Sequence, residues 1–484
     1  ITASAGTSNT RVGVNAGNSI ASGGNYNVVV GDEAGTALTT GDSNTAVGFE
    51  ALKTEDANGH NVALGYQALK TQNAGADAYN VAIGSGAGTG ITTGIANVLV
   101  GGLAGDVITT GSRNIAIGLN TLGSNILGSH SIAIGDAALD AQNFTTATNA
   151  YNVAVGSSAG GAVTTGTLNT LIGGLAGDAL TSGNNNTAVG YLALSADTLG
   201  DRNTAIGNSA LAAQNFTTTT DSYNTAVGFT AGASITTGVQ NTLIGGLAGD
   251  AITDADANVA LGYLALSANT VGSNSVAVGG AALQVQNPAT ATDMYNVAVG
   301  HQAGKAVTTG VSNTLIGALA GDALTDADFN VAIGVVALST DTLGSKSVAI
   351  GHNTLNSQNF TTATDTHNVA IGFQAGTGIT TGVQNTLIGS LAGDAITDAD
   401  FNVAIGINAL TTDTLGGKSV AVGHSALANQ NFTTATDSYN TAVGDVAGTA
   451  ITTGTQNTIV GGLAADSLTI GFQNVAIGVD ALSN

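Results

Sequence analysis

Hydrophobic and small residues recur along the chain in one five-residue pattern: Asn, an aliphatic residue or Thr, usually Ala, an aliphatic residue, and Gly. A clear example is Asn80-Val81-Ala82-Ile83-Gly84. From Gly84 to Gly444 the steps between closing glycines are 17, 17, 17 and 21 residues, a super-repeat of 72 residues. Self-similarity at a fixed period is typical of repeat architectures. Copies in corresponding positions lie at Asn152–Gly156, Asn224–Gly228, Asn296–Gly300, Asn368–Gly372 and Asn440–Gly444.

The pattern alternates as a β-strand does, so Val81 and Ile83 share one face and Ala82 lies on the other. Gly84 closes the strand where the chain must turn tightly. A second apolar run follows in each unit, such as residues 91–93, and we expect it to form a second short strand. Stacked coils would pair strand on strand at about 4.8 Å, with the repeated Asn forming a side-chain ladder. The sequence therefore predicts an all-β fold, a parallel β-roll or β-solenoid of 17- and 21-residue coils.

The repeat also sets the expected organisation, because a solenoid grows by adding coils rather than separate cores. Residues 1–84 form an irregular first super-repeat, residues 85–444 form five full ones, and residues 445–484 begin a sixth. No linker interrupts them, and the closing glycines mark 27 coils. Because the only Met is Met294 and the sequence stops partway through a coil, we expect a processed form or a slice of a longer protein.

Composition narrows the classes of function. The 484 residues include 71 Gly, one Pro and no Cys, and 43% are apolar, which excludes collagen, disulfide frameworks and disorder. With 31 acidic against 8 basic residues the net charge is −23, which disfavours nucleic acid and anionic membranes as partners. No apolar run approaches the length of a transmembrane helix.

The middle position of the five-residue pattern is never polar in the regular part of the chain. A strand with one face in water should alternate apolar with polar residues. Since a coil has one interior, we expect the middle row to be covered by neighbouring copies of the chain. A bare aliphatic row would be an aggregation seam. The predicted oligomer interface comprises Ala82, Leu99, Leu171, Leu243, Leu315, Leu387 and Ile459.

Several copies of the pattern begin with Ser, as in Ser131–Gly135, Ser275–Gly279, Ser347–Gly351 and Ser419–Gly423. They resemble the Ser-Val-Ala-Ile-Gly repeat of trimeric autotransporter adhesin heads and related repeats of phage tail-fibre shafts. The resemblance implies a left-handed β-roll, three chains packed side by side, and a place on a cell or virion surface. The chain departs from the adhesins in its longer coils and 21-residue insertions, and it lacks their stalk and membrane anchor.

The 21-residue coils carry a loop on which many of the few aromatic residues gather. These side chains could stack on a glycan or a protein receptor. We favour a structural role, in which they plug the edge of the roll or pack against a neighbouring protomer. The loops also contain Asn-Phe-Thr sequons at Asn143, Asn215, Asn359 and Asn431, relevant where such sites are glycosylated. The candidate aromatic residues are Phe144, Tyr151, Phe216, Tyr223, Tyr295, Phe360, Phe432 and Tyr439.

Acidic residues cluster in some coils, as at Asp250, Asp254 and Asp256. Closely spaced carboxylates can hold Ca²⁺, but the glycine that an EF-hand loop needs is missing. We expect an Asp-rich turn that binds no metal tightly, and no cofactor. Three acids lie five residues before a base, which predicts the exposed ion pairs Asp197–Arg202, Asp341–Lys346 and Asp413–Lys418.

No constellation of nucleophile, base and pocket indicates an enzyme. His301, His352 and His424 follow closing glycines several coils apart, and we interpret them as solvated turn residues rather than a metal site on a trimer axis. We expect a non-enzymatic extracellular fibre, a homotrimeric shaft or head that projects a host- or surface-binding region. The alternatives are a self-assembling filament or sheath without a receptor and, more remotely, an ice-binding solenoid with rows of Thr.

Overall fold

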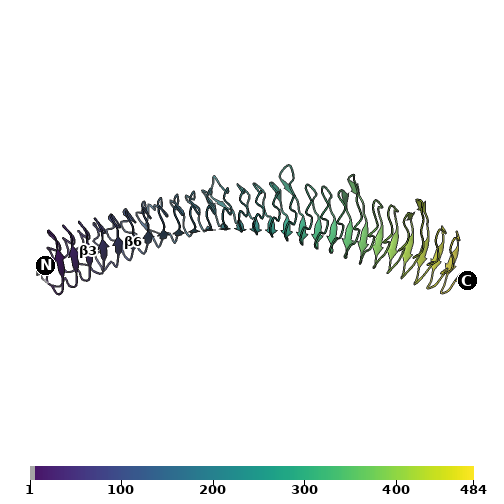
Figure 1. The fold of residues 1–484 in the computed structure, drawn as a ribbon, viewed down its shortest axis with the longest axis horizontal. Helices are drawn as coiled ribbons and strands as arrows, with labels where there is room; N and C mark the ends of the chain where they lie inside the picture. The colour runs from purple at the N-terminus through teal and green to yellow at the C-terminus, as the bar shows by residue number, and fades with distance from the viewer. Residues whose placement is uncertain (1–5, 484) are drawn as a thin grey trace. The chain divides into compact units, whose positions relative to one another are not determined.

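The computed structural model describes residues 6–483 as an all-β parallel β-solenoid, and these residues contain no helix. The chain divides into two compact units, one up to Asn241 and one from Thr242. In each unit every coil contributes one three-residue strand to a parallel sheet, and the strands stack one coil after another (Figure 1). The fold class predicted from the repeat is confirmed.

The strands of the first unit are β1 (Thr10–Val12), β2 (Val28–Val30), β3 (Thr45–Val47), β4 (Val62–Leu64), β5 (Val81–Ile83), β6 (Val98–Val100), β7 (Ile115–Ile117), β9 (Ile132–Ile134), β11 (Val153–Val155), β12 (Thr170–Ile172), β13 (Thr187–Val189), β15 (Thr204–Ile206) and β17 (Thr225–Val227). Those of the second unit are β18 (Thr242–Ile244), β19 (Val259–Leu261), β21 (Val276–Val278), β23 (Val297–Val299), β24 (Thr314–Ile316), β25 (Val331–Ile333), β27 (Val348–Ile350), β29 (Val369–Ile371), β30 (Thr386–Ile388), β31 (Val403–Ile405), β33 (Val420–Val422), β35 (Thr441–Val443), β36 (Thr458–Val460) and β37 (Val475–Ile477). Two-residue strands pair beside the 21-residue loops: β8 (Gly128–Ser129) with β10 (Thr148–Asn149), β14 (Gly200–Asp201) with β16 (Thr220–Asp221), β20 (Gly272–Ser273) with β22 (Thr292–Asp293), β26 (Gly344–Ser345) with β28 (Thr364–Asp365), and β32 (Gly416–Gly417) with β34 (Thr436–Asp437).

Neighbouring strands pair in register, so equivalent positions of successive coils lie side by side; Ala82, for example, lies opposite Leu99. The motif Asn is buried and links coils, because the backbone N–H of Asn97 donates to Asn80 Oδ1 at 2.8 Å. The Asn97 side-chain amide also donates to the Gly111 carbonyl at 3.0 Å. This ladder satisfies polar groups that would otherwise be buried without partners, and the predicted Asn ladder is confirmed.

The second strand predicted at the Thr-Thr runs is wrong, and the described residues have a second, two-residue strand only beside the 21-residue loops. Thr92 and Thr93 form a bend, and the Thr109 carbonyl of the next coil accepts the N–H groups of Thr92, Thr93 and Gly94 at 2.9, 3.3 and 3.1 Å. One carbonyl that accepts three successive donors requires a tight turn, whereas an extended ladder pairs each carbonyl with one donor. The Thr-Thr-Gly run is therefore a corner of the coil.

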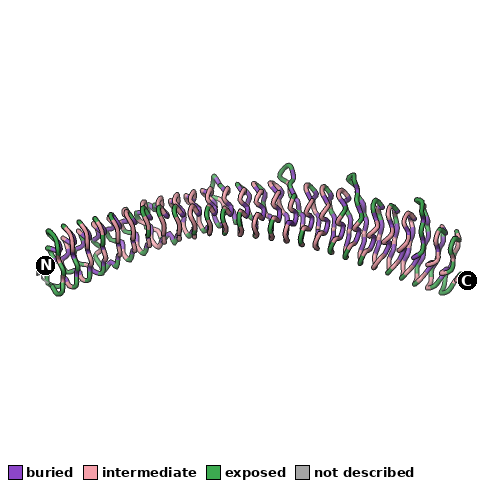
Figure 2. The backbone as a smooth tube through the Cα atoms, viewed as in Figure 1, coloured by how far each residue is buried: buried purple, intermediate pink, exposed green. Residues whose placement is uncertain are grey.

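The middle position of each strand points into the coil's own interior, so the predicted oligomer interface is wrong. The seven residues proposed for it are Ala82, Leu99, Leu171, Leu243, Leu315, Leu387 and Ile459, and a single chain leaves at most 1% of any of them exposed. Alternation correctly separated the two faces of the strand, but it does not say which face meets the core. Figure 2 shows the buried residues running along the coils.

A Leu fits in every fourth coil because glycines at the adjacent corners make room for it. A Cβ atom at Gly88 would lie 2.8 Å from Leu99 Cδ1, and one at Gly105 would lie 2.9 Å from Leu99 Cδ2. The coils of Ala116 and Ala133 carry Ala in the strand and a buried Leu at the corner, whereas the coil of Ala82 carries Gly88 at the corner, beside Leu99 of the next coil. The large side chain thus alternates between strand and corner, which keeps the interior filled.

Candidate interaction surface

The outward face of the strands is formed by their first and third residues, which are aliphatic or Thr in nearly every coil. These positions are half-buried or exposed in a single chain, in contrast to the buried middle row. Ten of its larger side chains leave between 36% and 43% of their surface in solvent. They are Val28, Leu64, Ile117, Ile172 and Ile206 in the first unit, and Ile244, Leu261, Ile316, Val443 and Val460 in the second. We call this the outward strand face.

Aromatic and charged side chains border the outward strand face, at the residue before the motif Asn and the residue after the closing Gly. They pair between adjacent coils: the rings of His60 and Tyr79 stack at 4.9 Å, and Arg202 lies over the Tyr223 ring at 5.5 Å. The predicted turn histidines fall in these rows, since His352 stacks on Phe373 at 5.6 Å. Exposed rings beside cations are suited to contact with a partner or ligand.

The aromatic residues proposed on the 21-residue loops divide into two groups. The Phe side chains are plugs, as favoured above, with 5–6% of their surface exposed, whereas the Tyr side chains leave 50–58% in solvent. Two of the plugs cover a glycine: a Cβ atom at Gly128 would lie 2.9 Å from Phe144 Cδ2, and one at Gly416 would lie 2.6 Å from Phe432 Cδ2. The buried set is Phe144, Phe216, Phe360 and Phe432, and the exposed set is Tyr151, Tyr223, Tyr295 and Tyr439.

One 21-residue loop fills the plug position differently. Pro288 replaces the Phe, and the fully buried Met294 occupies a position held by Ser222 and Ser438 in sibling loops. A Cβ atom at Gly272 would lie 3.0 Å from Met294 Cγ and 3.1 Å from Pro288 Cδ. The long Met side chain therefore supplies volume that the missing ring would have filled.

The three predicted ion pairs are wrong, although each base is paired. Lys346 and Lys418 reach one coil further and contact Asp365 and Asp437, each at 2.5 Å. Arg202 pairs with Asp221 in the same way. The acids expected as partners point inward instead, because the tight turn between acid and base places the two side chains on different sides of the coil wall; they are Asp197, Asp341 and Asp413.

The inward acids lie beneath the plugs and are fully buried. Asp413 accepts the Gly416 N–H at 3.0 Å, the Phe432 N–H at 3.2 Å and the Gln430 side-chain amide at 2.5 Å. Burial raises the pKa of Asp413 and of its counterpart Asp197, partly offset by these donors. At equivalent positions the chain uses the neutral Asn125 and Asn269.

The acidic turns form hydrogen bonds to the adjacent coils. Asp398 accepts the Thr381 hydroxyl at 2.5 Å, and Asp400 accepts the Val383 N–H at 2.8 Å. At the turn proposed for calcium, the Asp256 N–H donates to Ser273 Oγ at 3.0 Å. Within residues 6–483, no three His, Cys, Asp or Glu side chains are grouped as a metal site requires. Calcium binding near Asp254 and Asp256 stays untested.

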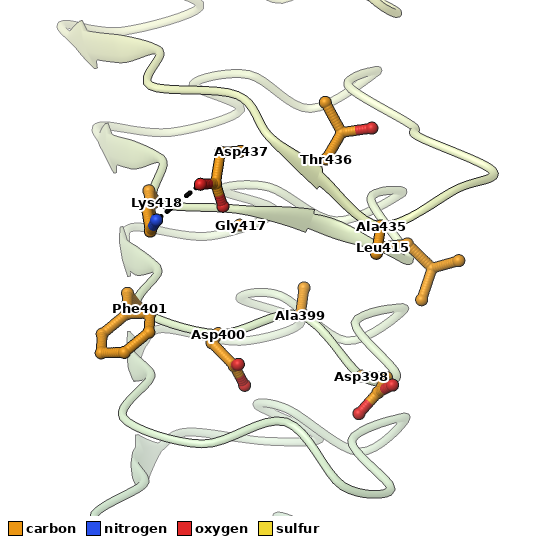
Figure 3. A pocket seen from close by; sticks show the side chains of 10 residues that line it. All are labelled: Asp398, Ala399, Asp400, Phe401, Leu415, Gly417, Lys418, Ala435, Thr436 and Asp437. Atoms are coloured by element: carbon orange, nitrogen blue, oxygen red, sulfur yellow. Dashed lines mark hydrogen bonds and ion pairs between the residues drawn. The ribbon is translucent and has the colours of Figure 1, made fainter.

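A cavity of about 490 Å³ opens on the second unit where an acidic turn meets a 21-residue loop (Figure 3). Asp400 and Phe401 come from one coil, Lys418 from the next, and Thr436 and Asp437 from the loop. The Lys418 ammonium binds Asp437 and lies 3.3 Å from the Tyr439 hydroxyl. The cavity thus combines an exposed ring, carboxylates and one cation. Gly417, which also lines the cavity, was not among the candidate residues predicted from the sequence.

The chain matches no known protein family in sequence, and no curated protein matches it either. Its class is therefore defined by its fold, a parallel β-solenoid with an apolar outward strand face. None of the described residues forms a helix that could cross a membrane.

Proposed function

We propose that the chain is the non-enzymatic shaft or head of an extracellular fibre, in which three copies associate through the outward strand face. The observation that carries the proposal is the run of aliphatic side chains left partly exposed on coil after coil of each unit. Burying such surface contributes about 25 cal/mol per Å². Repeated over many coils, the gain couples association to folding.

A second and third copy of the same chain are the simplest occupants of this face. The exposed rows repeat with the spacing of the coils, so a partner with the same spacing can present an apolar side chain to each coil. The trimeric state and the left-handed coil rest on the resemblance to adhesin heads and tail-fibre shafts. A place on a virion or cell surface rests on the same resemblance.

The exposed tyrosines and the cation–aromatic pairs border the association face and would remain available to a surface receptor, a glycan or a protein. The alternative function, a self-assembling filament or sheath, differs from this proposal only in that it binds no receptor. Ice binding is less well supported, because Thr hydroxyls of the Thr-Thr-Gly corners bind carbonyls of the next coil; Thr92 and Thr109, for example, do so at 3.2 Å each.

Sedimentation analysis of the wild-type chain tests the association, and we expect a trimer. Placing carboxylates in the dry interface with Ile244→Asp and Ile316→Asp together should shift the particle toward monomer or unfold it. The control Thr217→Asp changes an exposed loop residue and should leave the trimer intact. A stable wild-type monomer, or a double variant that assembles normally, would refute the proposal.

A further inference from the structure

A ladder of side-chain acceptors joins successive coils near the acidic turns. The side chain two residues before the motif Asn or Ser accepts a backbone N–H from the preceding coil. Thus the N–H groups of Ser112, Asp256 and Asp328 donate to serine hydroxyls at 3.0, 3.0 and 2.9 Å. The serines that accept them are Ser129, Ser273 and Ser345. Asn184 donates in the same way to Asp201 Oδ1 at 2.6 Å.

Gly417 removes this acceptor one super-repeat after Ser345. Among the described residues, 6–483, the Asp400 N–H that should meet it has no hydrogen-bond partner. A Cβ atom at the buried Gly417 would lie 3.7 Å from that nitrogen. Both residues line the cavity of Figure 3, so a hydrogen-bond donor at its wall is left for something outside the chain.

The preceding super-repeat provides a matched comparison. Nine of the ten cavity-lining residues are identical there, and Ser345 in place of Gly417 is the single difference. The Ser345 hydroxyl accepts the Asp328 N–H, and Gly417 has no side chain that could accept the equivalent N–H of Asp400. A hydroxyl group supplied by a ligand would restore the same hydrogen bond.

The other walls define the rest of the ligand. Asp398 and Asp400 each have one carboxylate oxygen bound to the preceding coil, and their remaining lone pairs can accept from ligand hydroxyls. Phe401 leaves 47% of its surface exposed and offers an apolar face. Three carboxylates against Lys418 disfavour an anion. The volume of about 490 Å³ is typical of small-molecule sites.

We propose that this cavity is a saccharide site, in which a hydroxyl of a neutral sugar accepts the Asp400 N–H and the ring lies against Phe401. The proposal deepens the receptor-binding role proposed above by naming a ligand class. It does not require association of chains, since residues 398–437 of one chain supply every lining residue.

Ligand-observed saturation-transfer NMR with galactose, mannose, N-acetylglucosamine and glucuronate tests it. We expect at least one neutral sugar to bind the wild-type chain, and glucuronate to bind at least tenfold more weakly. Gly417→Ser, which copies Ser345, should weaken binding at least tenfold without changing the melting midpoint. Ser345→Gly should create a second site, doubling the stoichiometry by isothermal titration, and Phe401→Ala should weaken binding several-fold.

Two outcomes would overturn the site: no neutral sugar binds the wild-type chain, so that the cavity holds solvent only, or Gly417→Ser binds as well as wild type. A Ser345→Gly variant that gains no site would also contradict it, because the other lining residues are the same. Sedimentation and sugar binding of the wild-type chain separate the two proposals. A trimer that binds no sugar would refute only the saccharide site, and a monomer that binds sugar would refute only the association.

Discussion

The closing glycines should be the positions least tolerant of substitution, and one adjacent pair isolates the reason. Gly245 closes β18 at a φ of +135°, and a Cβ atom there would lie 2.6 Å from the Gly262 carbonyl oxygen. Gly246 has no positive φ, and the nearest atom to its added Cβ would be Tyr263 Cδ2 at 3.7 Å. Ala at position 246 therefore meets ordinary contact, and Ala at position 245 does not.

Two costs add at position 245. Backbone conformations that only glycine adopts readily cost about 1–3 kcal/mol for other residues. The clash is with backbone of the next coil rather than with a movable side chain, so two coils must separate locally and weaken their ladder. Together these effects predict a loss of at least about 3 kcal/mol for Gly245→Ala, against less than about 0.5 kcal/mol for Gly246→Ala.

Urea unfolding followed by circular dichroism compares the two variants, and hydrogen exchange locates the damage. Faster exchange of amides in β18 and β19 in Gly245→Ala alone is the expected local signature, because solenoid coils depend mainly on their nearest neighbours. Equal midpoints for the two variants, or equal exchange in these strands, would refute the reasoning.

Two further predictions concern the interior beneath the loops. Because burial raises the pKa of Asp413, the folded chain holds its proton to higher pH than the unfolded chain, so stability falls as pH rises from the unfolded pKa through the folded one. Asp413→Asn, which copies Asn269, should therefore stabilise the chain at pH 7 by on the order of 1 kcal/mol in thermal melts. That gain should shrink as pH falls below the folded pKa, and a constant or negative gain would contradict this account. Met294→Ser should cost about 2–4 kcal/mol by leaving a cavity beside Pro288. Pro288→Phe alone should overpack the site, while the double variant should recover stability in a double-mutant cycle; additive losses would argue against volume exchange.

The period and the glycines were sufficient to predict the solenoid, because a strand and a tight turn repeated at a fixed spacing are what stacked coils require. The orientation of the strand was predicted wrongly. Val81, Ala82 and Ile83 are all apolar, so alternation does not show which face of the strand meets the interior. A usable signal did exist: each strand Leu is accompanied by corner glycines, as at Gly88 and Gly105 around Leu99, which only a shared interior explains.

The candidate sites were harder to foresee for a related reason. Asp413 and Lys418 occur together in the sequence, but the true partner, Asp437, lies in the next coil, and a similar acid occurs in most super-repeats. Gly417 was not predicted as a site residue, because a single glycine does not stand out in a chain with 71 of them. Its meaning appears only beside Ser345, whose hydroxyl has a defined task in the structure.

The exchange of Leu between strand and corner also sets the increment by which such a chain can change length. Removing one 17-residue coil would bring together interiors that are too full or too empty, because a Leu would lose the glycines that accommodate it. Removing four coils, 72 residues in all, returns each strand Leu to glycines at its neighbouring corners. Recombination between super-repeats can therefore lengthen or shorten this protein in whole steps while each junction keeps a complete interior.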